Sequence, residues 1–179
     1  MAILLAIICV MCSCFFKNKN IIKESYLTIL KDSDKYECLE DWSVYILSEI
    51  AHENVCAISV KNDTGNWIGL PLTVVLEQLG VKITWKSENV ATLDYEGKKL
   101  FINEDKQIIH EKRSEFNELS APTGGKVYYE FIGGEVIVCS SSLVAICFAL
   151  GIQVNCVIMN EKQTIHIGKI ENSSLSSEE

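Results

Sequence analysis

The sequence predicts an α+β fold in which two helices pack on a mostly antiparallel, twisted β-sheet. The first observation is a unit of helix, glycine and strand that occurs twice, at 70–85 and 141–156. The second is that the remaining strands are joined mostly by short turns, which favour antiparallel neighbours. The third is an ordinary globular composition, with 48% hydrophobic and 22% charged residues among 179. The two repeated helices are the available cover for the apolar face of the sheet.

Both copies of the repeated unit place apolar residues at i, i+3, i+4 and i+7, the spacing of one helix face. Gly80 and Gly151 follow, 71 residues apart, and each ends its helix because glycine enters the left-handed conformation at little cost. Apolar and polar residues then alternate, which predicts a half-buried strand in each copy. The matched apolar positions are Leu72, Val75, Leu76 and Leu79 in the first copy, and Leu143, Ile146, Cys147 and Leu150 in the second.

The other elements are predicted from periodicity and turn residues. The spacing of Trp42, Tyr45 and Ile46 predicts an amphipathic helix over 39–50. Gly133-Gly134 is typical of a two-residue hairpin turn. Further strands are expected at 55–60, 67–68, 91–95, 99–103, 126–132, 135–138 and 165–167, with a polar, irregular segment at 105–119.

The first 14 residues resemble a secretory leader, because they are apolar and uncharged. They are too short for an ordinary spanning helix, which needs roughly 20 apolar residues. Met11-Cys12-Ser13-Cys14 resembles a bacterial lipobox, in which Cys14 would be lipidated and become the mature N-terminus. An uncleaved membrane anchor, a cleaved signal without lipid and a cytosolic protein are the alternatives.

The leader sets the predicted division of the chain. A tether with a short helical segment is expected at 15–53, because 17–35 is polar and rich in lysine. The α+β domain is expected at 54–169, with half-units at about 66–95 and 135–168. Residues 170–179 are acidic and serine-rich, which predicts a solvated, disordered tail.

Charge and cysteine count exclude several function classes. The net charge of −8 leaves no basic face for nucleic acid. No glycine-rich phosphate loop, GxSxG or HExxH motif occurs. Beyond the leader an odd number of cysteines remains and no CxxC pair, so a disulfide scaffold is not expected. Those cysteines are Cys38, Cys56, Cys139, Cys147 and Cys156, of which the last two replace Leu76 and Trp85 in the repeat and are expected as small core residues.

The run from Trp67 to Trp85 resembles the signature of the copper amine oxidase N-terminal-like domain, also called the stalk domain. Ala121-Pro122 falls where that family has an alanine–proline stretch between its two half-units, so the resemblance covers 55–169. Thr73 replaces the family's arginine, and Cys156 replaces its second tryptophan. The residues that carry the structural motif are Pro71, Gly80, Trp85 and Gly151.

The resemblance implies an exported bacterial protein with a structural or binding role. It implies no copper chemistry, because the oxidase's metal site lies in a different domain. Such domains stand beside cell-wall hydrolases or adhesion modules on exported proteins.

The candidate reactive residues have simpler structural explanations. His52, His110 and His166 show no metal-ligand spacing, so no metal site is expected. A nucleophile pair of Cys139 and His166 is formally available, since a thiolate near a helix N-terminus has a lowered pKa. The alternative is that Cys139 lies in a cap region already filled by serines. Aromatic residues that could line a glycan groove are Trp67, Trp85, Tyr95, Tyr128 and Tyr129, with Trp85 favoured as core and one of the two tyrosines facing out.

These observations favour a non-catalytic domain of the cell envelope with a structural, binding or presentation role. No catalytic, metal or cofactor residue is predicted, and lipidation is expected at Cys14. The partner is expected to be an envelope protein or a cell-wall polymer, not nucleic acid, with membrane contact through the N-terminus. The location is exported, either membrane-anchored or extracellular. The alternatives are a small enzyme or accessory acting on cell-wall polymer, and an inhibitor or regulator of an envelope enzyme.

Overall fold

A computed structural model describes residues 28–31, 33–51, 55–62, 65–87, 90–103, 108–110 and 129–170. The predicted leader with Cys14, the start of the tether, Ala121-Pro122 and the acidic tail from residue 171 onward lie outside the described residues.

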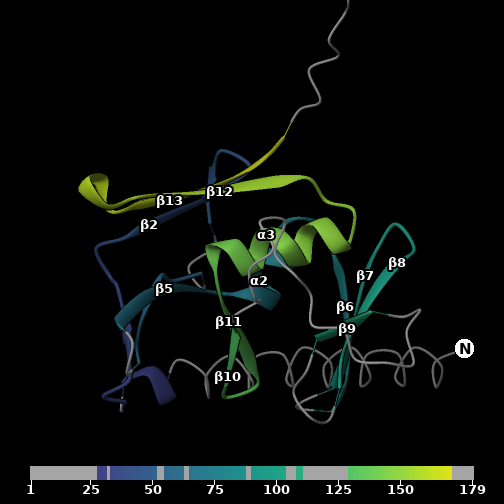
Figure 1. The fold of residues 1–179 in the computed structure, drawn as a ribbon, viewed down its shortest axis with the longest axis horizontal. Coiled ribbons are helices and arrows are strands. Elements are labelled where there is room, and N and C mark those ends of the chain that lie inside the picture. The colour runs from purple at the N-terminus through teal and green to yellow at the C-terminus, as the bar shows by residue number, and fades with distance from the viewer. Residues whose placement is uncertain are drawn as a thin grey trace, which may run out of the picture.

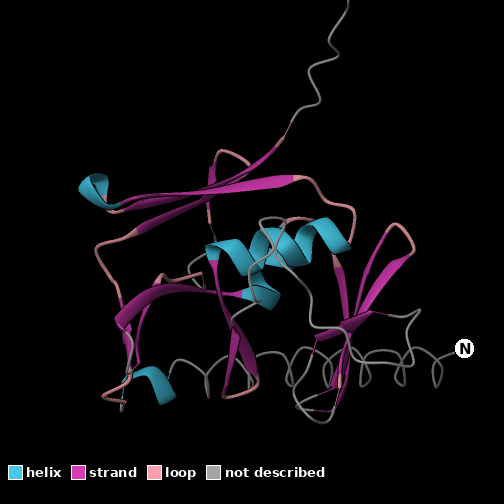
Figure 2. Ribbon diagram, in the orientation of Figure 1, coloured by secondary structure: helices cyan, strands magenta, loops and turns pink. Residues whose placement is uncertain are grey.

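Three β-sheets lie around two helices (Figures 1 and 2). Among the described strands every pairing is antiparallel except that of β13 with β2, which confirms the α+β class and the mostly antiparallel sheet. The five-stranded sheet contains, in spatial order, β1 (Tyr36–Cys38), β4 (Ile58–Asn62), β5 (Gly65–Pro71), β11 (Glu135–Cys139) and β10 (Tyr129–Ile132). The β12 sheet contains β12 (Val154–Met159), β13 (Thr164–Lys169), β2 (Ser43–Ile46) and β3 (Glu49–Ile50). The β6 sheet contains β6 (Lys82–Ser87), β7 (Val90–Tyr95), β8 (Lys98–Ile102) and β9 (Ile108–His110).

The two helices start directly from the two central strands of the five-stranded sheet. β5 continues into α2 (Leu72–Gln78), and β11 continues into α3 (Ser140–Ala149). The two strands pair antiparallel, with Leu70 opposite Val138. After α2 the chain forms the hairpin β6–β7, and after α3 it forms the hairpin β12–β13, each at the edge of another sheet. The short 3₁₀ helix η1 (Asn160–Lys162) lies in the turn of the second hairpin.

Both helices end at the predicted glycines. Gly80 has a φ of +90° and Gly151 a φ of +81°, the left-handed region that favours glycine. Beyond each glycine a backbone N–H returns to the helix: Val81 donates to the Leu76 carbonyl at 2.9 Å, and Ile152 donates to the Cys147 carbonyl at 2.8 Å. These bonds satisfy carbonyls that a helix end would otherwise leave unpaired.

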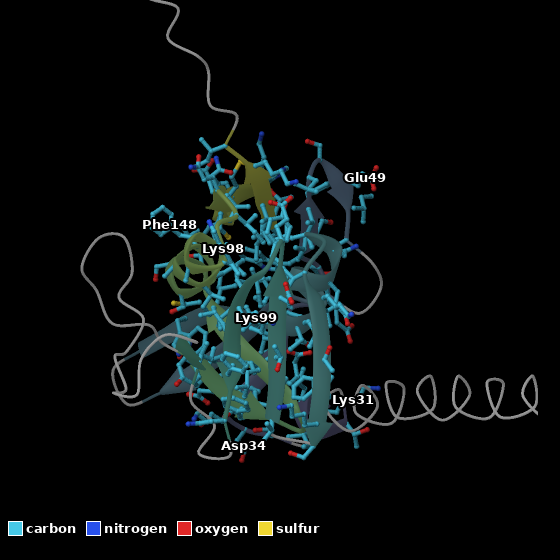
Figure 3. The ribbon with its side chains drawn as sticks, turned by 90° about the vertical axis from the view of Figure 1, so that its right-hand side faces the viewer. Lys31, Asp34, Glu49, Lys98, Lys99 and Phe148 are labelled. Carbon is cyan, nitrogen blue, oxygen red and sulfur yellow. The ribbon has the colours of Figure 1, made fainter. Side chains whose placement is uncertain are left out.

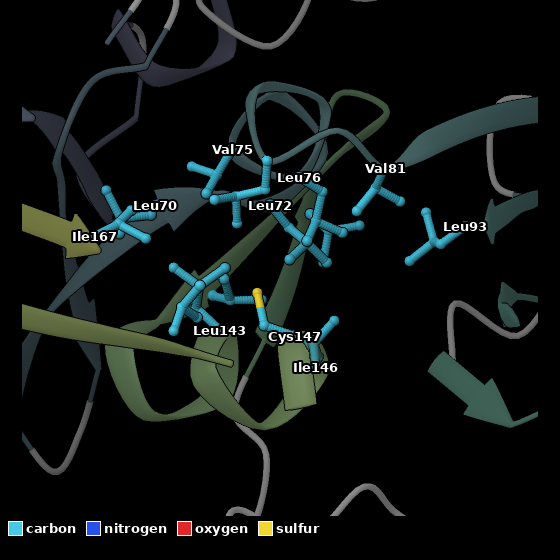
Figure 4. Close-up of a cluster of buried hydrophobic side chains, with 14 of the residues drawn as sticks. Leu70, Leu72, Val75, Leu76, Val81, Leu93, Leu143, Ile146, Cys147 and Ile167 are labelled. Carbon is cyan, nitrogen blue, oxygen red and sulfur yellow. The ribbon is translucent and has the colours of Figure 1, made fainter. Parts of the chain in front are cut away.

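The main core forms where the two helices face one another (Figure 4). The predicted apolar faces meet there, and strands of all three sheets close the core around them. Each fully buried side chain of this kind stabilises the fold by about 2 kcal/mol. The facing side chains are Leu72, Val75 and Leu76 of α2, and Leu143, Ile146 and Cys147 of α3.

A smaller core covers the opposite face of the five-stranded sheet. Ile58 and Ile137 are fully buried there, although the main core lies on the other side of their strands. Leu30, in the helical turn at 28–31, packs over them and is 4% exposed. The sheet is therefore apolar on both faces, and residues upstream of the predicted domain take part in its burial.

The helix predicted over 39–50 is wrong, because these residues form β2 and β3. Val44 and Ile46 both point into the main core with Tyr45 between them, which is the period of a strand. Leu47 and Ser48 make the turn between the two strands with φ values of 54° and 69°. The apolar spacing of residues 39–50 also fits a helix. These residues form a strand instead, because their alternation of buried and exposed side chains allows β2 to pair with β13.

The segment 39–55 is an excursion between two sheets. The chain leaves β1 of the five-stranded sheet, adds β2 and β3 to the β12 sheet, and returns to β4. β2 lies parallel to β13, with Val44 opposite Ile165. Residues 36–51 therefore belong to the folded domain, although the sequence placed them in the tether.

Candidate functional site

Three polar side chains are buried near the starts of the two helices: Thr73 of α2, Ser142 of α3, and Glu135, the first residue of β11. One carboxylate oxygen accepts the backbone N–H of Thr73 at 3.0 Å and that of Val136 at 2.8 Å, and the other accepts the Thr73 hydroxyl at 2.5 Å. Thr73 lies in the first turn of α2, whose N-cap residue, Pro71, makes no side-chain cap bond. Glu135 therefore caps α2 from a different strand.

Two opposing effects act on this carboxyl group. Burial raises the pKa of Glu135 to about 7, because the charged form loses its hydration, while the bonds from Thr73 and Val136 act to lower it. The burial effect is the larger. Glu135 is 5% exposed and is covered by the start of α2. Its hydrogen-bond donors, on Thr73 and Val136, are therefore groups of the protein itself.

Cys139 occupies the N-cap position of α3. Its thiol lies 3.2 Å from the Ser141 hydroxyl and 3.1 Å from the Ser142 hydroxyl. Burial alone would raise the pKa of Cys139, but hydrogen bonds from the two serines outweigh burial and lower it. The serine-filled cap region expected from the sequence is present, and the thiol is part of it.

His166 lies on the outer face of the β12 sheet. Its neighbours along β13, Ile165 and Ile167, point into the core, as their alternation predicts. The His166 ring stacks on Tyr45 of β2, with centroids 4.7 Å apart and planes 7° apart. Val157 of β12 lies opposite His166, and Ile50 of β3 lies opposite Tyr45. Val157, His166, Tyr45 and Ile50 therefore form a row across all four strands, which we call the cross-strand row.

The structure does not bring the nucleophile pair together. Cys139 lies at the start of α3, which packs on the inner face of the β12 sheet, whereas His166 is on the outer face. His52 and the side chain of His110 lie outside the described residues. In the part of the chain that the structure describes, no three His, Cys, Asp or Glu side chains are grouped as a metal site.

The candidate aromatic residues are divided between the two cores. Trp67 packs against the smaller core, whereas Trp85, Tyr95 and Tyr129 pack half-buried against the main core. The Tyr129 and Phe131 rings pack edge to face, with their centroids 5.9 Å apart. The Tyr129 hydroxyl accepts a hydrogen bond from the Ile108 N–H at 3.4 Å. Tyr128 lies outside the described residues, and the other rings do not line one groove.

The cysteines behave mostly as the sequence predicts. Cys147 is buried in the main core, and burial raises its pKa to about 12. Cys156 is half-buried against that core, and burial raises its pKa to about 11. Both thiols are therefore un-ionised core groups. Cys38 and Cys56 lie near one another, a pairing that their sequence separation did not suggest.

Among the described residues, the large apolar side chains exposed outside the cross-strand row are Ile29, Leu47, Phe148 and Ile170. Phe148 of α3 is 64% exposed and projects outward from the molecule (Figure 3). The Lys98 side chain reaches over Gly151, where its amine adds positive charge at the C-terminal end of α3. No helix among the described residues is both long and apolar enough to traverse a bilayer.

Comparisons of the chain with protein-family models, with curated proteins and with solved structures find no match. The fold class, α+β with mostly antiparallel sheets, is thus defined by the structure itself.

Proposed function

We propose that this chain is a non-catalytic, membrane-tethered domain of the cell envelope with a structural, binding or presentation role. The observation that carries the proposal is the order of elements on either side of the antiparallel pair β5 and β11: β5 is followed by α2 and the hairpin β6–β7, and β11 by α3 and the hairpin β12–β13. We interpret these two segments as half-units of a repeat. A repeat of this kind is what the resemblance to stalk domains implies.

The helix ends support the half-unit interpretation in detail. The Gly80 N–H donates to the backbone carbonyl of Glu77 at 3.0 Å, and the Gly151 N–H donates to that of Phe148 at 2.9 Å. Both bonds span three residues. In both helices the residue before the glycine has nearly the same conformation, with φ of −78° and ψ near 0°. Hairpins also flank the two central strands symmetrically, with β4 beside β5 and β10 beside β11.

The use of the polar groups supports a role without catalysis. The Glu135 carboxylate caps α2, the Cys139 thiol bonds to the serines of α3, and the His166 ring stacks on Tyr45. Each group therefore has a structural partner. The cross-strand row gives the outer face of the β12 sheet an apolar strip, which supports a binding role for an envelope partner.

Anchorage is assigned to the N-terminus. A lipid on Cys14 would hold the domain at the membrane, because each buried CH₂ of an acyl chain contributes about 0.8 kcal/mol. The polar segment that follows would separate the first strand, which begins at Tyr36, from the bilayer.

The decisive experiment compares the wild type with Cys14→Ser in a bacterial host. The mass of the membrane-extracted wild type should correspond to a chain starting at an acylated Cys14, and the variant should carry no acyl group. Cys12→Ser is the matched control and should still be acylated. A wild-type protein with an intact Met1 and no acyl mass would overturn the lipoprotein proposal.

The lowered pKa of Cys139 favours the second candidate, an enzyme or accessory acting on cell-wall polymer. Under that alternative the thiol would react with an electrophilic substrate. Cell-wall digestion by the purified protein that disappears in Cys139→Ser but persists in Cys56→Ser would favour it over the non-catalytic role.

A further inference from the structure

Cys38 and Cys56 lie at the point where the excursion 39–55 leaves the five-stranded sheet and returns to it. Cys38 is the last residue of β1, and Cys56 comes two residues before β4. The Leu39 N–H donates to the Ala57 carbonyl at 2.8 Å, so the two chain segments are already held together by backbone at this neck.

The side chains meet at the same place. Cys38 lies directly opposite Ile58 in the pair of β1 and β4, so their side chains share one face of the sheet. Cys56 comes two positions before Ile58, and side chains two positions apart along a strand point to the same face. Both thiols are therefore on one face. The two thiols are hydrogen-bonded to one another. Both are half-buried, which leaves them accessible to a small reagent.

We propose that Cys38 and Cys56 form a redox-reversible disulfide that closes the neck of the excursion. The closed loop would contain β2 and β3, the two strands through which this segment completes the β12 sheet. The bond would restrict the unfolded chain and favour the state in which both sheets are joined. The proposal does not depend on the envelope role, since purified protein and an added oxidant suffice to test it.

The reaction uses a low-molecular-weight disulfide such as oxidised glutathione. A protein thiolate attacks one sulfur of the reagent, the reagent's S–S bond breaks, and a mixed disulfide forms with release of one small thiolate. The second protein thiolate then attacks the protein sulfur of the mixed disulfide and releases the other small thiolate. Two electrons pass from the protein to the reagent, and the two thiol protons pass to solvent.

The local environment also affects the rate of the reaction. Burial first, and then the hydrogen bond with Cys56, raise the pKa of Cys38 to about 12. A raised thiol pKa makes the thiolate scarce, so we expect oxidation to be slow near neutral pH and faster as the pH is raised.

The test incubates the full chain with oxidised glutathione, followed by alkylation and peptide mass mapping. The peptides that carry Cys38 and Cys56 should appear joined, with two hydrogen atoms fewer than their summed mass. The melting temperature should rise by about 5–10 °C on oxidation and return on reduction. Unlinked peptides, or a stable glutathione adduct on the wild type, would overturn the proposal.

Single variants make the test specific. Cys38→Ser and Cys56→Ser each remove one partner of the bond, so both should lose the cross-link and neither should show the rise in melting temperature. Cys139→Ser removes another half-buried thiol and should keep both the cross-link and the rise. A rise in melting temperature that survives in Cys38→Ser would contradict the assignment.

Discussion

Glu135 shows how one residue can replace a missing local signal. The start of α2 contributes Pro71 but no side chain that accepts the free backbone N–H groups, and a carboxylate 62 residues away from Thr73 accepts one of them. The same carboxylate is almost fully buried, and burial raises its pKa although the hydrogen bonds of the cap act to lower it. This residue links the central strand β11 to α2, the helix that follows β5.

The raised pKa makes stability depend on pH in a defined direction. The carboxyl binds its proton more tightly in the folded state, where its pKa is about 7, than at its ordinary value of 4.5. Its contribution to the free energy of unfolding is therefore complete below about pH 4.5 and decreases by up to about 3 kcal/mol as the pH rises through 7.

Glu135→Gln isolates this effect, because an amide does not titrate. Urea unfolding of both proteins across this pH range should show the loss in the wild type and a flatter profile in the variant. Parallel profiles would show that Glu135 ionises normally in the folded protein.

Gly69 is a second residue whose identity is determined by packing, because its neighbours leave no room for a side chain larger than hydrogen. A Cβ at this position in β5 would lie 2.4 Å from a methyl carbon of the buried Ile137 and 3.1 Å from the Trp67 ring. Gly69→Ala should therefore reduce the free energy of unfolding by about 1–3 kcal/mol. Gly168→Ala is the matched control in a strand, because its Cβ meets only the Asn155 side-chain oxygen at 3.1 Å. Equal unfolding midpoints for the two variants would contradict the packing argument.

The ends of α2 and α3 have nearly the same backbone conformation and hydrogen bonds. Gly80→Ala and Gly151→Ala should each reduce the free energy of unfolding by about 1 kcal/mol, since alanine is strained at positive φ. A Cβ at Gly151 also meets Lys98, but only the flexible end of its side chain, which can move aside. Gly80→Asn should lose less, because asparagine tolerates this conformation.

Thermal or urea unfolding of these variants checks the equivalence of the two helix ends. A loss confined to one glycine would mean that the two ends are stabilised differently.

The sequence predicted the elements whose signals are local. The two helices, their terminal glycines and the Gly133-Gly134 turn follow from spacing and backbone preference, and both turn glycines do have positive φ. β2 and β3 were missed, because their apolar spacing also fits a helix and their turn, Leu47-Ser48, contains none of the usual turn residues for positive φ.

The candidate site was less predictable than the fold, because its contacts join distant segments. Nothing near Glu135 in the sequence marks it as a helix cap, since its partner Thr73 is 62 positions away. The stacking of His166 on Tyr45 depends on the parallel pairing of β13 with β2. That pairing in turn depends on the excursion, which the sequence assigned to a tether.

At the scale of the whole molecule, the excursion joins the sheets into one structure. Val44 and Ile46 are buried in the main core, and Leu30 is buried in the smaller one. A chain covering 28–170 should therefore unfold in one cooperative transition, whereas a chain covering 54–169, the predicted domain, should lose cooperativity. Circular dichroism during urea unfolding distinguishes them, and a cooperative transition in the shorter chain would show that Leu30 and the strands β1 to β3 are dispensable.

The segments β5–α2 and β11–α3 meet at the antiparallel pair β5 and β11. Nuclear magnetic resonance of the folded protein tests this pairing directly through contacts between backbone protons of neighbouring strands. We expect cross-strand contacts that place Leu70 opposite Val138, as in an antiparallel pair, in a sheet where β4 and β10 are the outer neighbours. Absence of contacts between β5 and β11, or contacts of a parallel pair, would contradict it.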